Sequence, residues 1–345
     1  MRARVMRWLL RWLVRSVVLA LLLAGAAAGS GWWWLQQPLT LASPTVEVSI
    51  EPGQSPRRVA ELWVQAGVQA EPRWLYEWFR WSGQSRQIRA GSYQIQAGVT
   101  PRTLLDKMVR GDEVMESVRL VEGSTVAQMR EALAKAPALR ASTREMSGAQ
   151  LMAALGEPSA APEGRFFPDT YAYSRGVSDL TVLKRAHAAM QRRLVSAWAE
   201  RASDSPLKSM DEALILASVV EKETGRDADR AQVAAVFSNR LRIGMPLQTD
   251  PTVIYGLGAA FDGNLRKRDL LADTPFNTYT RRGLPPTPIA LAGAASLRAA
   301  VQPAQSKALY FVARSDGGGG SVFSDNLADH NRAVNQFQRG GKAAP

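Results

Sequence analysis

The stretch Ser209–Gly244, SMDEALILASVVEKETGRDADRAQVAAVFSNRLRIG, predicts two consecutive helices. Its first half predicts a buried helix, because an unbroken apolar run, LILASVV, lies between clear start and stop signals. Ser209 with Glu212 three residues later forms a capping box at the start. Gly225 stands where a left-handed residue would end the helix.

The second half of this stretch predicts another helix directly after the first. Asp229 with Gln232 repeats the capping box, and Gly244 follows the last apolar position. We therefore expect an α+β domain in which these two helices carry the chemistry. The apolar face of the second helix repeats at helical spacing, at Val233, Val236, Phe237 and Leu241.

Two carboxyl groups, those of Glu221 and Glu223, lie in the last turn of the first predicted helix. Apolar neighbours disfavour the charged form of a carboxyl group, and the helix dipole adds up to about 1 kcal/mol in the same direction. Both effects raise a pKa, which suits an acid that cleaves a glycosidic bond. Because residues two apart point roughly 200° away from each other on a helix, only one can face a substrate. An ion-paired helix end with Lys222 or Arg226 is the alternative.

Composition excludes several classes of protein. With 345 residues, 46% of them hydrophobic, the chain is long enough for one or two cores. It has no cysteine, which excludes a disulfide framework and a thiolate metal site. His187 and His330 stand alone without metal-binding spacing, so we expect neither a metal site nor a cofactor. The chemistry must then come from carboxylates and hydroxyls.

The net charge of +12 does not indicate a nucleic-acid partner, because of where the charge lies. Five of the positive charges come before any acidic residue and directly ahead of an apolar run, and the remaining +7 is scattered. Such a surface suits a protein that works beside anionic lipids or an acidic polymer. The five residues are Arg2, Arg4, Arg7, Arg11 and Arg15.

An apolar segment, residues 16–35, SVVLALLLAGAAAGSGWWWL, runs without a charge for a length that spans the roughly 30 Å hydrocarbon core. It predicts a single transmembrane helix in the cytoplasmic (inner) membrane. The arginines of residues 1–15 would hold the N-terminus in the cytoplasm, which places the rest of the chain in the periplasm or outside. A cleaved signal peptide, with the small residues 26–29 as its processing site, is the alternative.

The pattern of strand, turn glycine, capping hydroxyl and helix occurs three times after a linker at residues 36–45. Such units resemble the LysM type of glycan-binding module, and ordinary packing units are the alternative. An aromatic stretch, Trp74–Trp81, either stacks on sugars or forms a core at helical spacing. The glycine and hydroxyl pairs are Gly53 with Ser55, Gly98 with Thr100, and Gly123 with Thr125.

Four segments together resemble the signature of the endolytic murein transglycosylase family (MltG, YceG-like). They are ASVVEKETG, VFSNRLRIGMPLQTDPTVIYGLG, FNTYTRRGLPPTPIA and SDNLADHN. The resemblance covers most of residues 160–335 and keeps the segments in the family's order. One departure is Thr287, where GLPPTPI replaces the commoner GLPPGPI, and its proline neighbours still fix the loop.

The resemblance implies that Glu223, the Glu before Thr in EKET, is the essential acid and that Glu221 is a supporting residue. A lytic transglycosylase needs one catalytic carboxyl group where most glycosidases need two. It would protonate the oxygen that leaves C1 of N-acetylmuramic acid and close a 1,6-anhydro ring without water, as a lyase. His330, which follows a predicted hairpin with its turn at Gly317–Gly320, is expected to be structural. The residues expected to line the glycan groove are Gln248, Asp250, Tyr255, Asn277 and Tyr279.

The expected function is internal cleavage of the MurNAc–GlcNAc bond in nascent peptidoglycan strands, which limits strand length beside the penicillin-binding synthases. One alternative is a muramidase-type hydrolase with Asp250 or Glu221 as second carboxylate. The other is a noncatalytic peptidoglycan-binding scaffold. The expected architecture is α+β, with a cytoplasmic N-terminus (1–15), a transmembrane helix (16–35), a linker (36–45), a LysM-like domain (46–135) and a catalytic domain (160–340).

Overall fold

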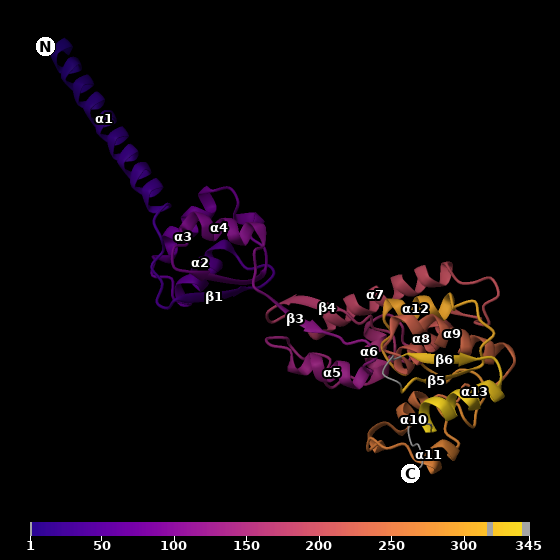
Figure 1. The fold of residues 1–345 in the computed structure, drawn as a ribbon. Coiled ribbons are helices and arrows are strands. Elements are labelled where there is room, and N and C mark those ends of the chain that lie inside the picture. Colours follow the sequence, from indigo (N-terminus) through magenta and orange to yellow (C-terminus); the bar gives the residue numbers. More distant parts are fainter. Residues whose placement is uncertain (1, 316–319, 340–345) are drawn as a thin grey trace. The chain divides into compact units, whose positions relative to one another are not determined.

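A computed structural model describes residues 2–315 and 320–339 of the chain (Figure 1). The chain forms two compact units. The first comprises Met1–Glu116 with Ser174–Gly176, and the second comprises Ser117–Tyr173 with Val177–Pro345. Both units mix helices with short two-stranded sheets, so the protein is α+β.

The N-terminal helix α1 (Arg2–Trp34) contains one stretch that is long and apolar enough to cross a membrane. This stretch, Trp12–Trp34, has a mean hydropathy of 1.9, and the protein buries none of its most apolar window. An exposed apolar helix of this length is compatible with a single membrane anchor. It includes the predicted residues 16–34, and the helix continues through the arginines before them.

The rest of the first unit is a small domain built on one antiparallel strand pair. Strands β1 (Thr45–Ile50) and β2 (Gly91–Gln96) pair from Thr45 opposite Gln96 to Ile50 opposite Gly91. Alternate residues of β1 point into the core, as a half-buried strand requires. Helices cover this face, and Trp63 and Phe79 are fully buried among them. They are α2 (Pro56–Gln65), α3 (Pro72–Trp81) and α4 (Pro101–Arg110), with a short 3₁₀ turn at Ser85–Gln87.

The three predicted strand-to-helix connections are confirmed at the level of their caps. The hydroxyls of Ser55, Thr100 and Thr125 each accept the backbone N–H three residues on, at the starts of α2, α4 and α5 (Val126–Lys135). The preceding glycines all have positive φ, between 74° and 98°. The first two copies form one core, whereas the third, after β3 (Met115–Arg119), packs with other residues of the second unit. The LysM-like range 46–135 stays a prediction.

The second unit contains two adjoining hydrophobic cores. One lies around α5, α6 (Gly148–Ala154), β4 (Thr170–Ser174) and the start of α7 (Asp179–Ala199). The other surrounds α8 (Met210–Glu223), whose residues from Ala213 to Val220 are all buried. Helices α7, α9 (Asp227–Arg242) and α12 (Ala294–Val301) pack against α8. This central helix carries both Glu221 and Glu223.

Shorter elements complete the second unit. Strands β5 (Tyr310–Ala313) and β6 (Ser321–Ser324) pair antiparallel, which confirms the predicted hairpin strands. Of the predicted Gly317–Gly320 turn, residues 317–319 lie outside the described residues. The remaining elements are α10 (Asp250–Leu257), a 3₁₀ turn (Gly258–Ala260), α11 (Lys267–Leu271), α13 (Leu327–Val334) and a π-helical turn (Asn335–Arg339).

The predicted ends of α8 and α9 are partly wrong. Ser209 does cap α8, but Glu212 accepts the N–H of Lys208 at 2.6 Å. Glycine 225 is not left-handed: α8 ends at Glu223, and Thr224 continues in an extended conformation with φ −141°. The second helix starts at Asp227, two residues before the predicted cap, without a side-chain cap. The chain instead passes between the two helices through extended backbone at Thr224 and Arg226.

Candidate active site

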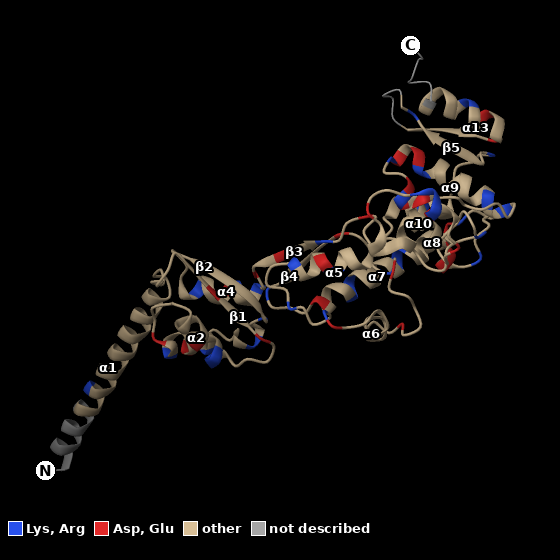
Figure 2. Cartoon of the chain, turned by 90° about the horizontal axis from the view of Figure 1, so that it is seen from below, with Lys and Arg blue, Asp and Glu red and all other residues tan. Residues whose placement is uncertain are grey.

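The carboxyl group of Glu223 lies at the C-terminal end of α8, where α8, α9 and α10 come together (Figure 2). Its Oε2 accepts a hydrogen bond from the hydroxyl of Thr249. Burial raises the pKa of Glu223, and the negative charge of Asp250 raises it further, whereas the Thr249 bond and the Arg240 charge oppose the rise. The carboxyl group is therefore held toward its protonated form, as the apolar sequence of α8 predicts.

Thr249 is held on Glu223 by a tightly connected turn before α10. Its own N–H donates to the hydroxyl of Thr278 at 3.2 Å, and Thr252 shares a hydrogen bond of 2.9 Å with the same hydroxyl. The neighbouring Gln248 has a φ of +49°, which is uncommon for a residue other than glycine. Its N–H donates to the Thr278 carbonyl at 3.1 Å. The side chain of this strained residue is exposed, next to Thr249, the hydrogen-bond partner of Glu223.

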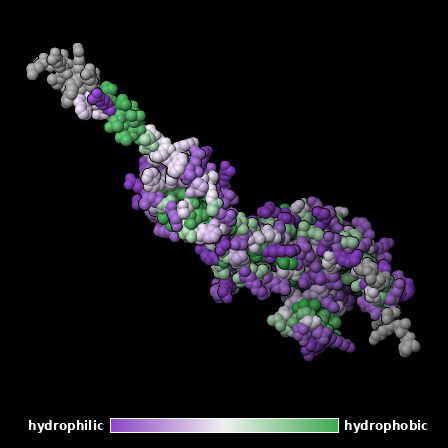
Figure 3. Space-filling model, turned by 60° about the vertical axis from the view of Figure 1, so that its left-hand side comes forward, coloured by the Kyte–Doolittle hydropathy of each residue, from purple (hydrophilic) through white to green (hydrophobic). Residues whose placement is uncertain are grey.

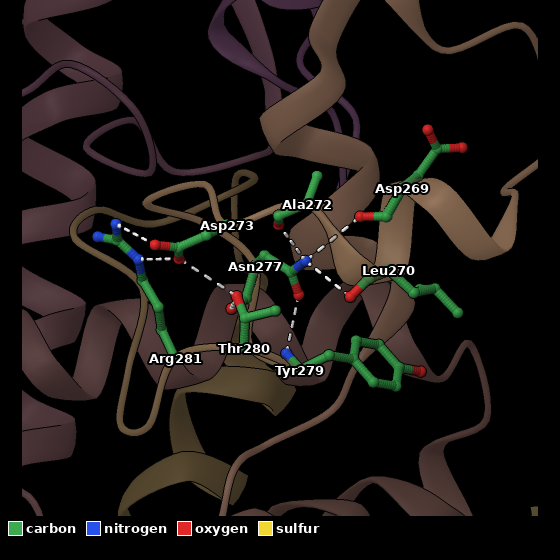
Figure 4. Close-up of polar contacts among 8 residues, drawn as sticks. All are labelled: Asp269, Leu270, Ala272, Asp273, Asn277, Tyr279, Thr280 and Arg281. Atoms are coloured by element: carbon green, nitrogen blue, oxygen red, sulfur yellow. Dashed lines mark hydrogen bonds and ion pairs between the residues drawn. The ribbon is translucent and has the colours of Figure 1, made fainter.

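Asn277 organises the segment that follows α11 from inside the protein (Figure 4). It is fully buried, and its amide nitrogen donates to the carbonyls of Asp269, Leu270 and Ala272 at 3.3, 3.0 and 2.7 Å. Its amide oxygen accepts the N–H of Tyr279 at 2.9 Å. The amide nitrogen and oxygen of Asn277 thus both bond to backbone groups of the protein, and they fix the backbone at Tyr279.

Tyr279 and Asp250 form a hydrogen-bonded pair near Glu223. The tyrosine hydroxyl donates to Oδ1 of Asp250 at 2.6 Å. Burial, the bond to Asp250 and the charges of Asp250 and Glu223 all raise the pKa of Tyr279, so its hydroxyl keeps its proton at neutral pH. Asp250 itself is exposed at the start of α10. These two side chains are open to a ligand, unlike Asn277.

Arg240 supplies the positive charge that faces Glu223. It is only 7% exposed, and its guanidinium donates to the carbonyls of Leu309 and Leu247 at 2.7 and 2.8 Å. Burial lowers the pKa of Arg240, while the charges of Tyr310, Tyr279 and Glu223 oppose this change. An arginine has so high an ordinary pKa that it stays charged. Its positive charge therefore favours the carboxylate that Glu223 becomes after giving up a proton.

His330 lies close to this arginine. Its ring stacks on Tyr310 at 5.2 Å, and Arg240 lies 5.4 Å from the same tyrosine ring. Burial and the Arg240 charge lower the pKa of His330, so the imidazole is neutral at pH 7. Its Nδ1 is buried and finds no hydrogen-bond partner among the described residues. His330 therefore packs against the site.

Glu221 has a separate set of partners, as the helix geometry predicts. Its Oε2 accepts the N–H of Gly293 at 2.9 Å, at the start of α12. Its Oε1 lies 3.9 Å from Arg230 of α9, and both side chains are 7% exposed. Glu221 also raises the pKa of the nearby Glu122, after burial, which has the larger effect. Glu221 thus ties α8 to α9 and α12 and does not share the surroundings of Glu223.

Tyr255 faces a second buried carboxyl group. Its hydroxyl donates to Oε2 of Glu163 at 3.1 Å, and its ring packs edge-on against Phe276 at 4.9 Å. Glu163 also accepts the N–H of Val126 at the start of α5, at 3.0 Å. Burial raises the pKa of Glu163, and the bonds from Val126 and Tyr255 oppose the rise. This cluster joins α5 to α10.

Sequence reasoning did not single out Thr249, Arg240 or Glu163. Thr249 and Glu223 are 26 residues apart, so no local pattern links them. Arg240 lies in a helix rich in charged residues, where a solvated arginine is the ordinary expectation. The one available signal was that Arg240 follows the apolar positions Val236 and Phe237 at helical spacing and so lies on the buried face.

The protein is thus an α+β protein with an apolar N-terminal helix and, at the end of its central helix, a part-buried carboxyl group whose pKa is raised. The YceG-like family model matches residues 48–336. The chain belongs to this family.

The chain is also similar to proteins of known name. The chain is 30% identical over 317 residues to the endolytic murein transglycosylase of Bacillus subtilis, with 85% of each chain covered. It is 32% identical over 177 residues to the endolytic murein transglycosylase of Streptococcus pneumoniae strain D39, covering 50% of this chain and 31% of that one. A crystal structure of a yceG-like protein from Listeria monocytogenes has a TM-score of 0.53 at 25% identity and covers 84% of this chain and 98% of that chain.

Proposed function

We propose that this protein is an endolytic murein transglycosylase, a lyase that cuts glycan strands of peptidoglycan internally. The observation that carries the proposal is the environment of Glu223: a carboxyl group with a raised pKa, a hydroxyl partner and an arginine charge nearby. Membership of the YceG-like family and the names of the relatives support the same activity.

In this proposal the protonated carboxyl group of Glu223 donates its proton to the glycosidic oxygen as that oxygen leaves C1 of N-acetylmuramic acid. The N-acetyl group of the same sugar assists at C1. The resulting carboxylate takes the proton of the 6-hydroxyl, whose oxygen bonds to C1 and closes the 1,6-anhydro ring. Glu223 ends protonated again, and no water is consumed. The Thr249 hydrogen bond and the Arg240 charge stabilise the intermediate carboxylate.

We assign the other predicted site residues to two roles according to their exposure. Gln248, Asp250 and Tyr279 are exposed or part-exposed beside Glu223 and are proposed to contact sugar. Asn277 and Tyr255 are held by bonds within the chain and are proposed to position the groove segments. Glu221 supports the helix end from the other side, through Gly293 and Arg230.

We also propose where the enzyme works. Helix α1 would anchor it in the cytoplasmic membrane, with the basic N-terminus in the cytoplasm and the remaining chain outside. The substrate would be nascent strands, which the enzyme shortens beside the penicillin-binding synthases. A membrane-anchored enzyme is confined near the place where such strands emerge, which supports an action on new strands.

Product analysis tests the proposal. The purified full chain, acting on uncross-linked glycan strands, should yield shorter strands of many disaccharides that end in 1,6-anhydro-N-acetylmuramic acid. Mass spectrometry separates the alternatives, because a hydrolase that uses Asp250 as second carboxylate leaves ends heavier by one water. Reducing ends of that heavier mass would overturn the lyase assignment, and unchanged strands would indicate a binding scaffold.

A further inference from the structure

The small domain of the first unit is held close to the end of the membrane helix. Between Trp34, the last residue of α1, and Leu39, which is buried in the small domain, lie four residues, which extend at most about 14 Å. The N–H of Leu39 donates to the Val99 carbonyl at 2.8 Å. Trp34 itself packs against the domain core, so the tether is anchored at both of its ends.

Helix α3 of the small domain meets the end of α1 (Figure 1), where Arg102 and Asp106 of α4 also lie near Trp32. The rings of Trp34 and Trp74 lie 6.2 Å apart. Two hollows flank this junction, and each is lined by residues of α1 and of α3. The first hollow contains Trp33, Trp34 and Trp74, and the second contains Trp32, Leu35 and Trp78.

Helix α3 exposes two tryptophans to solvent. Trp74 is 60% exposed and Trp81 is 77% exposed. Among the aromatic residues whose side chains the structure describes, no other outside α1 is exposed. The two lie seven residues apart, on one side of the helix, together with the part-buried Trp78. On the other side of the helix, Leu75 and Phe79 are buried in the core of the small domain.

We propose that the exposed face of α3, Trp74 and Trp81, lies in the lipid interface of the membrane that α1 crosses. Tryptophan prefers the headgroup level of a bilayer, where its ring is half in hydrocarbon and its N–H is near water. Trp32 and Trp33, which are 61% and 65% exposed, mark that level on α1 itself. Figure 3 shows the uncovered apolar surface on the middle of α1, with residues of intermediate hydropathy between it and the small domain. The face of α3 continues the aromatic end of the anchor.

This arrangement has a functional consequence. An interfacial α3 fixes the tilt and rotation of the small domain on the membrane, whereas a single helix such as α1 does not by itself set these two angles in a bilayer. The exposed Arg73 and Arg80, each of which directly precedes one of the two tryptophans, lie at headgroup level in this arrangement. The inference rests on α1 as a membrane anchor, and the experiment separates the two claims.

The chain has no cysteine, so a single introduced cysteine is a unique site for a fluorescent label. Gln84→Cys places an environment-sensitive dye beside Trp32 and Trp78, and Glu51→Cys places it at the exposed end of β1 as a control. The full chain is reconstituted in phosphatidylethanolamine–phosphatidylglycerol vesicles with a nitroxide quencher on the lipids. We expect the dye at position 84 to be blue-shifted and quenched, and the dye at position 51 to be neither.

A double variant then tests the face itself. Trp74→Gln with Trp81→Gln should lower the quenching at position 84 while the protein still floats with the vesicles through α1. Equal quenching at positions 84 and 51, or full quenching in the double variant, overturns the inference. Protection of the dye at position 84 by soluble glycan strands, without lipid quenching, would assign the face to sugar instead. If the protein does not float with the vesicles, both the anchor and this inference are refuted. Formation of anhydro ends on glycan strands by the same samples reports on the proposed activity alone.

Discussion

Glu223→Gln should form 1,6-anhydro ends on uncross-linked glycan strands about 10²- to 10⁴-fold more slowly than the unaltered protein. The amide has nearly the shape of the carboxyl group and can still accept the Thr249 hydroxyl. It cannot donate a proton to a leaving oxygen. Because the charged form is already disfavoured by burial, the substitution should leave the unfolding midpoint almost unchanged.

Glu221→Gln is the matched control, since it removes a carboxyl group from the same helix two residues earlier. Here we expect the opposite pattern. Arg230 is buried and loses the ion pair with Glu221, which should lower the free energy of unfolding by about 1–3 kcal/mol. The folded protein should still form anhydro ends. Near-normal activity of Glu223→Gln, or equal inactivation by both substitutions with both proteins folded, would remove Glu223 from its assigned role.

Gly164→Ala should destabilise the second unit by about 2–5 kcal/mol. Gly164 has a φ of +77°, a conformation that costs an L-residue energy, and a Cβ there would lie 2.5 Å from Cβ of Pro288 and 2.7 Å from its Cγ. A proline ring cannot rotate away. Glu163, which accepts the hydrogen bond of Tyr255, directly precedes this glycine. Urea unfolding of the full chain in detergent measures the effect.

Gly283→Ala provides the control for that prediction. Gly283 also has a positive φ, +84°, but a Cβ there would meet no atom within 4 Å. It should therefore show only the backbone cost, about 1–2 kcal/mol. If both alanine variants unfold at the same urea concentration, the close approach of Gly164 to Pro288 does not contribute to stability.

Local signals predicted local structure well. The caps at Ser55, Thr100 and Thr125 follow from a hydroxyl and a turn glycine in one short segment, and nothing distant competes with them. The prediction for the link between α8 and α9 was wrong because Gly225 can adopt a left-handed conformation but is not required to. There the partners of the neighbouring side chains decide, such as Arg230 bonding to Asp227 at the start of α9.

The site could be predicted only in part. The apolar run before Glu223 indicated burial and a raised pKa, but the choice of Glu223 over Glu221 came from the family resemblance. The hydrogen bond to Thr249 and the charge of Arg240 arise from packing between segments far apart in the chain. An asparagine such as Asn277 is polar whether it faces a ligand or, as here, three backbone carbonyls, so its type does not reveal its direction.

We propose that the part-buried carboxyl group of Glu223 acts in its protonated form. The most direct test is the pH dependence of kcat/KM for release of anhydro ends, compared between the unaltered protein and Asp250→Asn. Activity should fall as pH rises through the raised pKa of Glu223, because the acid is lost. Asparagine can still accept the Tyr279 hydroxyl but removes the negative charge that raises this pKa, so the alkaline limb should move to lower pH. An alkaline limb that stays in place, or moves to higher pH, would contradict the account.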